Sequence, residues 1–345
     1  MKAAIFDTFG GPISIETVPD PSVVAGGVVL QVNATGLCRS DWHGWMGHDA
    51  DIRLPHVPGH ELAGTIVETG KGVKRFKVGD RVTVPFVGGC GHCEQCTSGN
   101  HQVCDHQFQP GFTHWGSFAE YVSIHYADVN LVKLPDSMEF RTAASLGCRF
   151  ITSYRAVVHQ GRLKQGEWVA IHGCGGVGLS ALMIAKAAGA QVIAIDIQPK
   201  ALSLAQHLGA DVLVNAREVE VVEAVKEASH GGAHLSIDAL GSKHTAYNSV
   251  ANLRKRGRHV QVGLLAGNDF EPRLPMQLVV ANELEILGSH GMQAHAYPEM
   301  MAQIASGRLK PERMIDSEIS LEDACRLLPK IGTEGLPGVS IITRF

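Results

Sequence analysis

A glycine-rich turn between a predicted strand and a predicted helix constrains the fold of this chain more than any other feature. Residues 167–178 read EWVAIHGCGGVG, and the glycines at 173, 175 and 178 fit the pattern G-x-G-x-x-G. The first glycine of such a turn permits a tight bend, the second lets the backbone approach a pyrophosphate, and the third lets the helix pack closely on the sheet. The phosphates then lie at the helix N-terminus, where unpaired N–H groups favour an anion. The turn predicts a dinucleotide-binding fold.

The residues around this turn alternate between strand and helix patterns. Strands are predicted over 167–171, 191–197, 211–216, 233–240 and 258–265, and helices over 175–189, 199–209 and 219–229. Strands that alternate with helices of this length are typical of a doubly wound parallel sheet. After residue 287 the pattern is mixed, with a predicted helix over 296–307 and a strand over 338–345.

Asp196 ends the strand that follows the turn, eighteen residues after Gly178. A carboxylate at this position accepts hydrogen bonds from the hydroxyls of the adenosine ribose and repels a 2′-phosphate. The sequence therefore favours NAD over NADP. Lys200 is interpreted either as a contact to the same ribose or as an exposed lysine on a helix.

The first 140 residues differ in composition and are rich in glycine and proline. Short strands are predicted over 26–38, 61–70 and 78–86, which indicates a compact, mostly β domain. A length of 345 residues is consistent with about two domains. The net charge of −4 gives no reason to expect a nucleic acid or an anionic membrane as a partner. The longest uncharged apolar stretch, residues 170–185, is too short and too rich in glycine to span a bilayer.

Four of the eight cysteines lie within the fifteen residues CGHCEQCTSGNHQVC, at positions 90, 93, 96 and 104. Disulfides, a redox relay, a metal site and a nucleic-acid finger all use such clusters. The N-terminus shows no secretory signal, so we expect a cytoplasmic protein, in which clustered thiols more often bind metal. No lysine or arginine lies between Arg81 and Lys133, which disfavours a finger that binds phosphates. Four thiolates can close a tetrahedral shell, so we expect a structural zinc site that cannot bind substrate.

Metal-ligand residue types also occur at three separate places: Cys38, His60 with Glu61, and Cys148. Two thiolates and one imidazole form a known catalytic zinc site, which leaves a fourth position for water or substrate. Each residue taken alone is more often a buried cysteine or a hydrogen-bonded histidine. These residues indicate a catalytic zinc site only in combination with the other motifs.

The segments GLCRSD (36–41), GHELAGTIVETG (59–70), CGHCEQCTSGNHQVC (90–104) and GCGGVG (173–178) occur in this order and at characteristic intervals. Together they resemble the zinc-dependent alcohol dehydrogenases of the medium-chain dehydrogenase/reductase family, over essentially the whole chain. The resemblance implies an α/β protein with a GroES-like, partly open β-barrel catalytic domain and a Rossmann NAD-binding domain. The catalytic domain is expected to comprise residues 1–149 and 288–345, and the Rossmann domain residues 150–287.

The resemblance also implies roles for residues of the catalytic zinc site. Cys38, His60 and Cys148 match the zinc ligands. Glu61 matches a carboxylate behind the metal that can ligate it transiently or act only through its charge. Asp41 matches a residue that fixes the ring of the ligand histidine through its second nitrogen.

Other roles follow from the same resemblance. Ser40 and His43 match a proton relay, and Arg39 matches a contact to the cofactor pyrophosphate. Phe86 matches a wall of the substrate pocket, and Trp42, Trp45 and Trp115 fit either this pocket or the core. The expected cofactor contacts are Arg39, Gly173, Gly175, Gly176, Val177, Gly178, Asp196, Lys200, Gly263 and Leu264.

The implied activity is a reversible, NAD-linked oxidation of a primary or secondary alcohol to an aldehyde or ketone, by hydride transfer from a zinc-bound alkoxide. Two zinc ions per chain are expected, one catalytic and one structural. The alternative is a polyol, threonine or glutathione-adduct dehydrogenase of the same superfamily. Cys148 favours the alcohol dehydrogenases, because several of the alternatives have a carboxylate as third ligand. The short connection after Cys104 resembles the tetrameric bacterial and yeast enzymes, so we expect a homotetramer.

Overall fold

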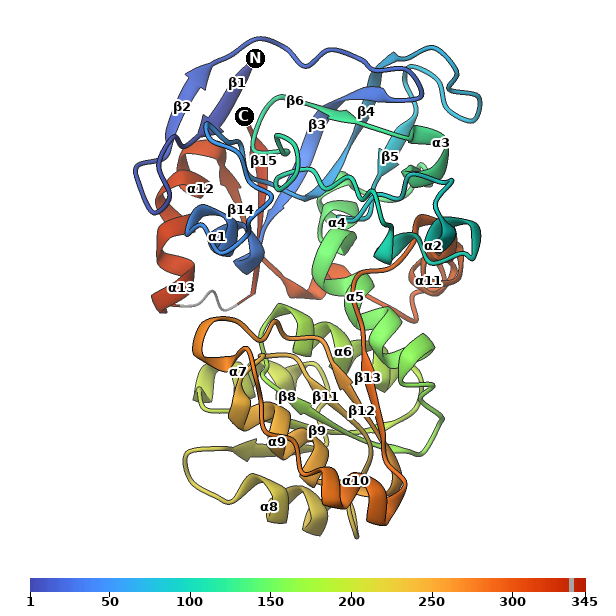
Figure 1. Cartoon of the computed structure of the whole chain (residues 1–345), viewed down its shortest axis with the longest axis vertical. Helices are drawn as coiled ribbons and strands as arrows, with labels where there is room; N and C mark the ends of the chain where they lie inside the picture. Colours follow the sequence, from blue (N-terminus) through green and yellow to red (C-terminus); the bar gives the residue numbers. More distant parts are fainter. Residues whose placement is uncertain (335–337) are drawn as a thin grey trace. The chain divides into compact units, whose positions relative to one another are not determined.

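The computed structural model describes residues 1–334 and 338–345 (Figure 1). Contacts within the chain divide it into two compact units. The first unit comprises Met1–Ile151, Gly291–Ala302 and Pro311–Phe345, and the second comprises Thr152–His290 and Gln303–Lys310. The chain thus leaves the first unit twice, after Ile151 and after Ala302, and returns to it each time. In the described residues, no helix combines the length and the apolar character that crossing a bilayer requires.

The second unit is built on a parallel sheet of six strands in the order β10-β9-β8-β11-β12-β13. The strands are β8 (Trp168–His172), β9 (Gln191–Asp196), β10 (Val212–Asn215), β11 (Ala233–Asp238), β12 (Leu253–Gln261) and β13 (Glu285–Gly288). Counted along the chain this order is 3-2-1-4-5-6, the doubly wound order of dinucleotide-binding folds. The central strands β8, β9 and β11 are buried along most of their length, as expected for a sheet that is covered on both faces.

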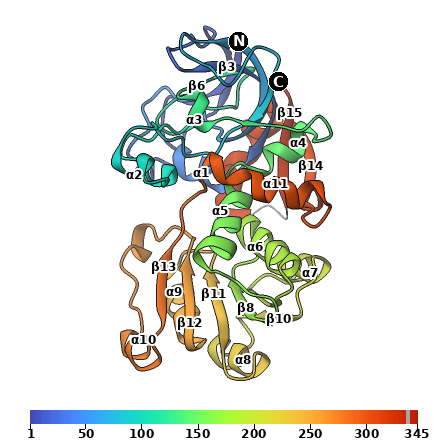
Figure 2. The same ribbon diagram turned by 90° about the vertical axis from the view of Figure 1, so that its right-hand side faces the viewer.

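Helices connect these strands. They are α6 (Gly176–Ala187), α7 (Pro199–His207), α8 (Val221–Ala228), α9 (Lys243–Ala251) and α10 (Met276–Asn282), and the chain enters the unit through α5 (Ile151–Tyr154) and η3 (Arg155–Gln160). Figure 2 shows α6 and α7 on one side of the sheet and α9 on the other. Successive strands are added on one side of β8 up to β10 and on its other side from β11 onward, so the carboxyl ends of β8 and β11 mark the position where such folds bind ligands.

The first unit contains a mixed sheet of seven strands, in the order β14-β15-β3-β4-β5-β7 with β6 on β3. The strands are β3 (Val28–Leu37), β4 (Glu61–Thr69), β5 (Arg81–Thr83), β6 (Tyr121–Ile124), β7 (Val132–Lys133), β14 (Ile315–Ser320) and β15 (Val339–Arg344), beside a small sheet of β1 (Lys2–Ile5) and β2 (Ser14–Thr17). The long strand β3 is central, because it pairs with β4 along one edge and with β6 and then β15 along the other.

Short helices connect and cover these strands. They are α1 (Arg39–Trp45), α2 (Glu94–Thr97), η1 (His101–Val103), α3 (Ala127–Asn130), α4 (Phe140–Ala144), η2 (Leu146–Phe150), α11 (Tyr297–Ala305), η6 (Pro311–Met314), α12 (Leu321–Leu327), η7 (Leu328–Lys330) and α13 (Ile331–Glu334). The remaining 3₁₀ turns are η4 (Gly267–Asp269) in the second unit and η5 (Ala294–Ala296) in the first.

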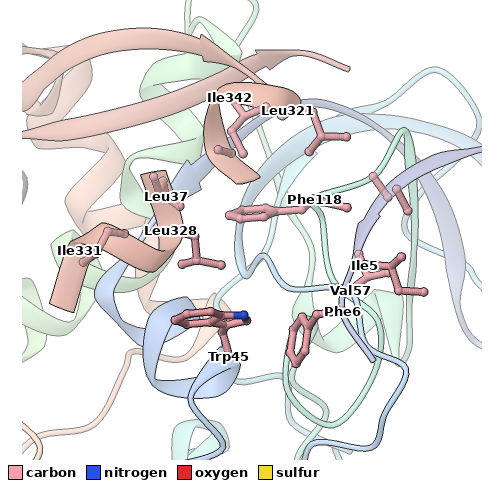
Figure 3. Close-up of a cluster of buried hydrophobic side chains, with 14 of the residues drawn as sticks. Ile5, Phe6, Leu37, Trp45, Val57, Phe118, Leu321, Leu328, Ile331 and Ile342 are labelled. Carbon is pink, nitrogen blue, oxygen red and sulfur yellow. The ribbon is translucent and has the colours of Figure 1, made fainter. Parts of the chain in front are cut away.

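A buried hydrophobic cluster fixes α1 within the first unit (Figure 3). Trp45 of α1 lies in it with Phe6 and Phe118, and the C-terminal helices add Leu328 and Ile331. Burial of each large side chain is worth about 1.5–3 kcal/mol. The cluster therefore anchors the segment that carries Cys38, Ser40 and His43.

Candidate active site and metal centres

Four metal-ligand side chains converge in the first unit. The ligand atoms of Cys38, His60, Glu61 and Cys148 all lie within 4.8 Å of one another. Cys38 follows β3, and His60 precedes β4, in which Glu61 pairs with Gly36 of β3. This antiparallel pairing places the ends of the two strands together, and η2 supplies Cys148.

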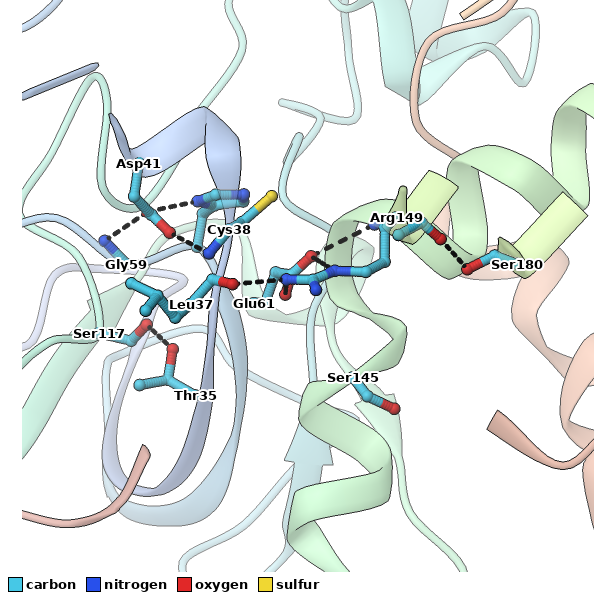
Figure 4. Close-up of polar contacts among 12 residues, drawn as sticks. Thr35, Leu37, Cys38, Asp41, Gly59, Glu61, Ser117, Ser145, Arg149 and Ser180 are labelled. Atoms are coloured by element: carbon cyan, nitrogen blue, oxygen red, sulfur yellow. Dashed lines mark hydrogen bonds and ion pairs between the residues drawn. The ribbon is translucent and has the colours of Figure 1, made fainter. Parts of the chain in front are cut away.

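The His60 ring is held in one orientation. Its Nδ1 lies 2.7 Å from Oδ1 of Asp41, whose carboxylate also accepts from the backbone N–H of Cys38 at 2.9 Å and of Gly59 at 3.0 Å (Figure 4). Because a carboxylate only accepts, Nδ1 donates to Asp41, and in the neutral ring, the form that binds a metal, Nε2 keeps its lone pair. Nε2 is buried and has no hydrogen-bond partner among the described residues. A lone pair aimed at two thiols fits a zinc ion, around which two sulfur ligands lie about 3.8 Å apart.

Arg149 is part of this centre, and sequence reasoning missed it. Its Nε donates to Oε1 of Glu61 at 2.9 Å, and its Nη2 donates to Oε2 at 2.5 Å and to the Leu37 carbonyl at 2.9 Å. Both side chains are buried, with Arg149 5% and Glu61 0% exposed. Burial alone would lower the pKa of Arg149, but the Glu61 carboxylate raises it, so the guanidinium stays charged.

Aromatic side chains surround the His60 ring. The ring centroids of Phe86 and Phe112 lie 6.1 Å and 5.1 Å from it. The fully buried Tyr297 has a hydroxyl with no hydrogen-bond partner in the part of the chain that the structure describes. Burial and the negative charges of Cys148 and Glu61 raise the pKa of Tyr297 well above its ordinary value. Phe112 and Tyr297 were not predicted, because neither stands in a recognisable motif.

The three tryptophans that fitted either pocket or core lie in different places. Trp45 belongs to the core cluster, is 8% exposed, and donates from Nε1 to the Gly11 carbonyl at 2.9 Å. Trp42 packs against the same cluster and lies edge-on to His43. Trp115 is partly exposed and donates to the Pro55 carbonyl at 3.0 Å. The packing of Trp45 is that of a core residue.

The predicted relay residues lie on α1. Ser40 and His43 are half-buried there, and Arg39 is exposed. Nδ1 of His43 lies 3.0 Å from Nδ1 of the exposed His48. Burial, with the positive charges of Arg39 and His48, lowers the pKa of His43 to about 4.

The second group of ligands is formed by Cys90, Cys93, Cys96 and Cys104, whose sulfurs lie within 4.8 Å of one another. Three of the four are buried and Cys93 is half-buried. Backbone N–H groups point at the sulfurs, including Cys90 to Cys104 at 3.3 Å and His106 to Cys104 at 3.2 Å. Four sulfurs that face one another fit a tetrahedral ion with no open position.

The glycine-rich turn lies in the second unit between β8 and α6. Gly173 has a φ of +94°, which favours glycine, and a Cβ on Gly178 would lie 1.8 Å from the Gly173 carbonyl oxygen. A Cβ on Gly175 would meet no atom within 4 Å. The first and third glycines are thus required by the turn itself, whereas the space beside Gly175 is available to a ligand. Gly176 begins α6, and the Val177 carbonyl accepts from Ser153 Oγ at 2.8 Å.

Asp196 lies beside this turn at the end of β9. Its Oδ2 accepts from the Cys174 N–H at 2.7 Å and its Oδ1 from the Gln198 N–H at 2.9 Å. Lys200 is exposed on α7. Gly263 packs against the backbone of Gly241, which a Cβ would approach to 2.2 Å, and the side chain of Leu264 is 61% exposed.

Comparisons with known proteins agree with this architecture. Residues 24–136 match the alcohol dehydrogenase GroES-like domain, and residues 176–306 match the zinc-binding dehydrogenases. The chain is 36% identical over 312 residues to an alcohol dehydrogenase of Geobacillus stearothermophilus, covering 90% of each chain. It is 32% identical over 335 residues to an NAD-dependent alcohol dehydrogenase of Sulfurisphaera tokodaii, covering 94% of each.

A solved structure is similar throughout. The alcohol dehydrogenase of Thermus sp. ATN1 superimposes with a TM-score of 0.90 at 28% identity, over 100% of both chains. The expected fold, a GroES-like domain with a Rossmann domain, is confirmed. The chain belongs to the zinc-dependent alcohol dehydrogenases of the medium-chain dehydrogenase/reductase family.

Proposed function

We propose that this enzyme catalyses the reversible, NAD-linked oxidation of a primary or secondary alcohol, with a catalytic zinc ion held by Cys38, His60 and Cys148. The observation that carries the proposal is the buried Nε2 of His60, which has no partner among the described residues and faces two thiols. Zinc at this site supplies Lewis-acid polarisation of the alcohol or carbonyl oxygen. Asp41 keeps the His60 lone pair directed at the ion.

Ser40 and His43 then move the proton that the alcohol loses. Ser40 accepts it at Oγ, and it passes to His43, whose Nδ1 contacts the exposed His48. With a pKa lowered to about 4, the His43 ring is neutral at pH 7, which is the form that can accept a proton. Phe86 is proposed to form one wall of the substrate pocket, and its distance of 6.1 Å from the His60 ring supports this role.

The second unit is proposed to bind NAD. The open space at Gly175 and the N-terminus of α6 suit the pyrophosphate, with Gly173, Gly176, Val177 and Gly178 forming the turn. The Asp196 carboxylate retains lone pairs for the ribose hydroxyls. Arg39, Lys200, Gly263 and Leu264 are proposed as further cofactor contacts. The similarity to a relative named as NAD-dependent supports the choice of NAD.

The second metal site is proposed to be structural. Zinc held by Cys90, Cys93, Cys96 and Cys104 has no position left for a substrate and stabilises an otherwise irregular loop. We further propose a cytoplasmic homotetramer, in which residues 1–149 and 288–345 form the catalytic domain and residues 150–287 bind the cofactor.

A rate screen tests the proposed reaction. Wild type and Cys38→Ser are assayed with NAD and NADP over primary, secondary, aromatic and polyol substrates, and metal content is measured in parallel. We expect about two zinc ions per chain, a preference for NAD, and a large loss of turnover in Cys38→Ser. Near-normal turnover in that variant would refute the zinc mechanism. Highest rates with a polyol would favour the alternative, a polyol dehydrogenase.

A further inference from the structure

We infer that Arg149 is a positioning residue that ties together the three segments carrying the zinc ligands and keeps Glu61 away from the metal's open position. The inference rests on the proposed zinc site and assigns to Arg149 a role within it. Figure 4 shows the guanidinium between Glu61 and Leu37.

The contacts of Arg149 reach all three ligand segments. Its side chain donates to Glu61, the residue after His60, and to the carbonyl of Leu37, the residue before Cys38. Arg149 itself follows Cys148, and its backbone N–H lies 3.3 Å from Oε1 of Glu61. One guanidinium is therefore bonded to the immediate neighbour of each ligand, so it orders the site without any contribution from the metal.

The chemistry of arginine suits this task. A guanidinium offers several N–H groups in one rigid plane, which lets it bind both oxygens of a carboxylate and a carbonyl at the same time. The bonds lie in the interior, where Arg149 is 5% exposed and water does not compete. A lysine could make only part of this set, because its ammonium is a single compact charge.

Glu61 lies so close to the three zinc ligands that the direction of its carboxylate decides whether it can bind the metal. One of its carboxylate oxygens lies within 4.8 Å of the three other ligand atoms. Two glycines make the room, since a Cβ on Gly36 would lie 2.2 Å from Oε2 and one on Gly147 would lie 2.8 Å from the Glu61 Cα. With both oxygens bonded to Arg149, the carboxylate is directed at the guanidinium. Without Arg149 it is an unpaired buried anion beside a zinc ion, and carboxylate oxygen is an ordinary zinc ligand.

The test compares Arg149→Met, Arg149→Lys and the double variant Arg149→Met/Glu61→Gln with wild type. The first readout is the rate at which a chelator removes each of the two zinc ions. The second is the absorption spectrum after the catalytic zinc is replaced by Co²⁺, since this spectrum reports the ligands. We expect Arg149→Met to lose the catalytic zinc about 10- to 100-fold faster and to show an altered cobalt spectrum. The double variant should regain the wild-type spectrum, because the competing carboxylate is gone.

Two controls separate this role from general destabilisation. Arg258→Met removes another buried arginine that pairs with a glutamate, because Arg258 Nη2 lies 2.6 Å from Glu167 in the second unit. It should leave both readouts of the catalytic site unchanged, and in Arg149→Met the zinc of the four cysteines should leave at the wild-type rate. If Arg149→Met does not fold, Arg149→Lys carries the test, with faster zinc loss expected.

If the folded Arg149 variant loses the catalytic zinc at the wild-type rate and has the wild-type cobalt spectrum, the inference is overturned and the proposed function is not. Wild-type protein that holds only the zinc of the four cysteines would instead overturn the proposed function.

Discussion

The imidazole rings of His43 and His48 face each other with their Nδ1 atoms 3.0 Å apart. Only one of the two nitrogens can donate in this contact, so the pair shares a single proton between the rings. His43 is half-buried and His48 is exposed, which places the second ring between the first and solvent. The contact supports a proton path that leaves α1 through His48.

Replacement of His43 by glutamine should lower kcat for alcohol oxidation at pH 7 by about tenfold or more, because positioned proton transfer contributes to the rate. Added imidazole buffer should restore part of the loss. His114→Gln is a matched control, since burial and the nearby His125 lower the pKa of His114 to about 4 as well. A kcat of His43→Gln equal to that of His114→Gln would exclude His43 from the relay.

Asp196→Asn should raise the KM for NAD about 10- to 100-fold, the effect of losing a hydrogen bond to a charged group, and should improve the use of NADP. Asparagine keeps the side-chain shape but has a single accepting oxygen, so one of the two backbone bonds, from Cys174 or from Gln198, remains. Steady-state kinetics with both cofactors measures the change. An unchanged ratio of kcat/KM between NAD and NADP would show that Asp196 does not read the ribose.

Cys96→Ser should empty the site of the four cysteines and lower the Tm by roughly 10 °C or more, while single-turnover hydride transfer at low temperature stays near wild type. Cys174→Ser serves as the control, because Cys174 is equally buried but lies in the glycine-rich turn, outside both ligand groups. Metal analysis and thermal unfolding measure the outcome. A Cys96→Ser enzyme as heat-stable and zinc-loaded as wild type would contradict a structural role.

The free energy of unfolding should depend on pH through His172, which is 1% exposed. Its Nε2 lies 2.7 Å from Nδ2 of Asn252. Burial, with the nearby His259 and His244, lowers the pKa of His172 to about 3. The unfolded chain therefore binds a proton more readily than the folded one between about pH 6.5 and pH 3. This group makes the free energy of unfolding fall by about 1.4 kcal/mol per pH unit as the pH drops through that window.

The free energy of unfolding, measured with urea between about pH 6.5 and pH 5, should depend less steeply on pH in His172→Asn than in wild type. The difference in slope should correspond to about one proton. His230→Asn is the control, because His230 is exposed and its φ of +54° is a conformation that asparagine tolerates. Equal slopes for wild type and His172→Asn would contradict the assignment.

Local patterns predicted the parts of this molecule whose determinants are local. The turn around Gly173 and Gly178 and the cluster at Cys90–Cys104 each depend on a few neighbouring residues, so spacing alone was informative. The ligands Cys38, His60 and Cys148 are far apart in sequence, and only the family resemblance joined them. Arg149 was missed because its importance comes from contacts with Glu61 and Leu37, which precede it by 88 and 112 positions in the sequence. Trp45 fitted pocket and core equally, and its packing partners are known only from the fold.

The pairing of β15 with β3 has a consequence for the biosynthesis of the enzyme. Ser340 and Ile341 pair with Leu37 and Gly36, the two residues immediately before Cys38, and Ile342 joins the cluster that fixes α1. A nascent chain that already exposes all three ligand residues still lacks the strand and the helices that hold the first of them. Capture of the catalytic metal should thus be a late event, completed after residues 339–344 have left the ribosome, whereas the sulfur cluster at 90–104 can load its ion much earlier in translation.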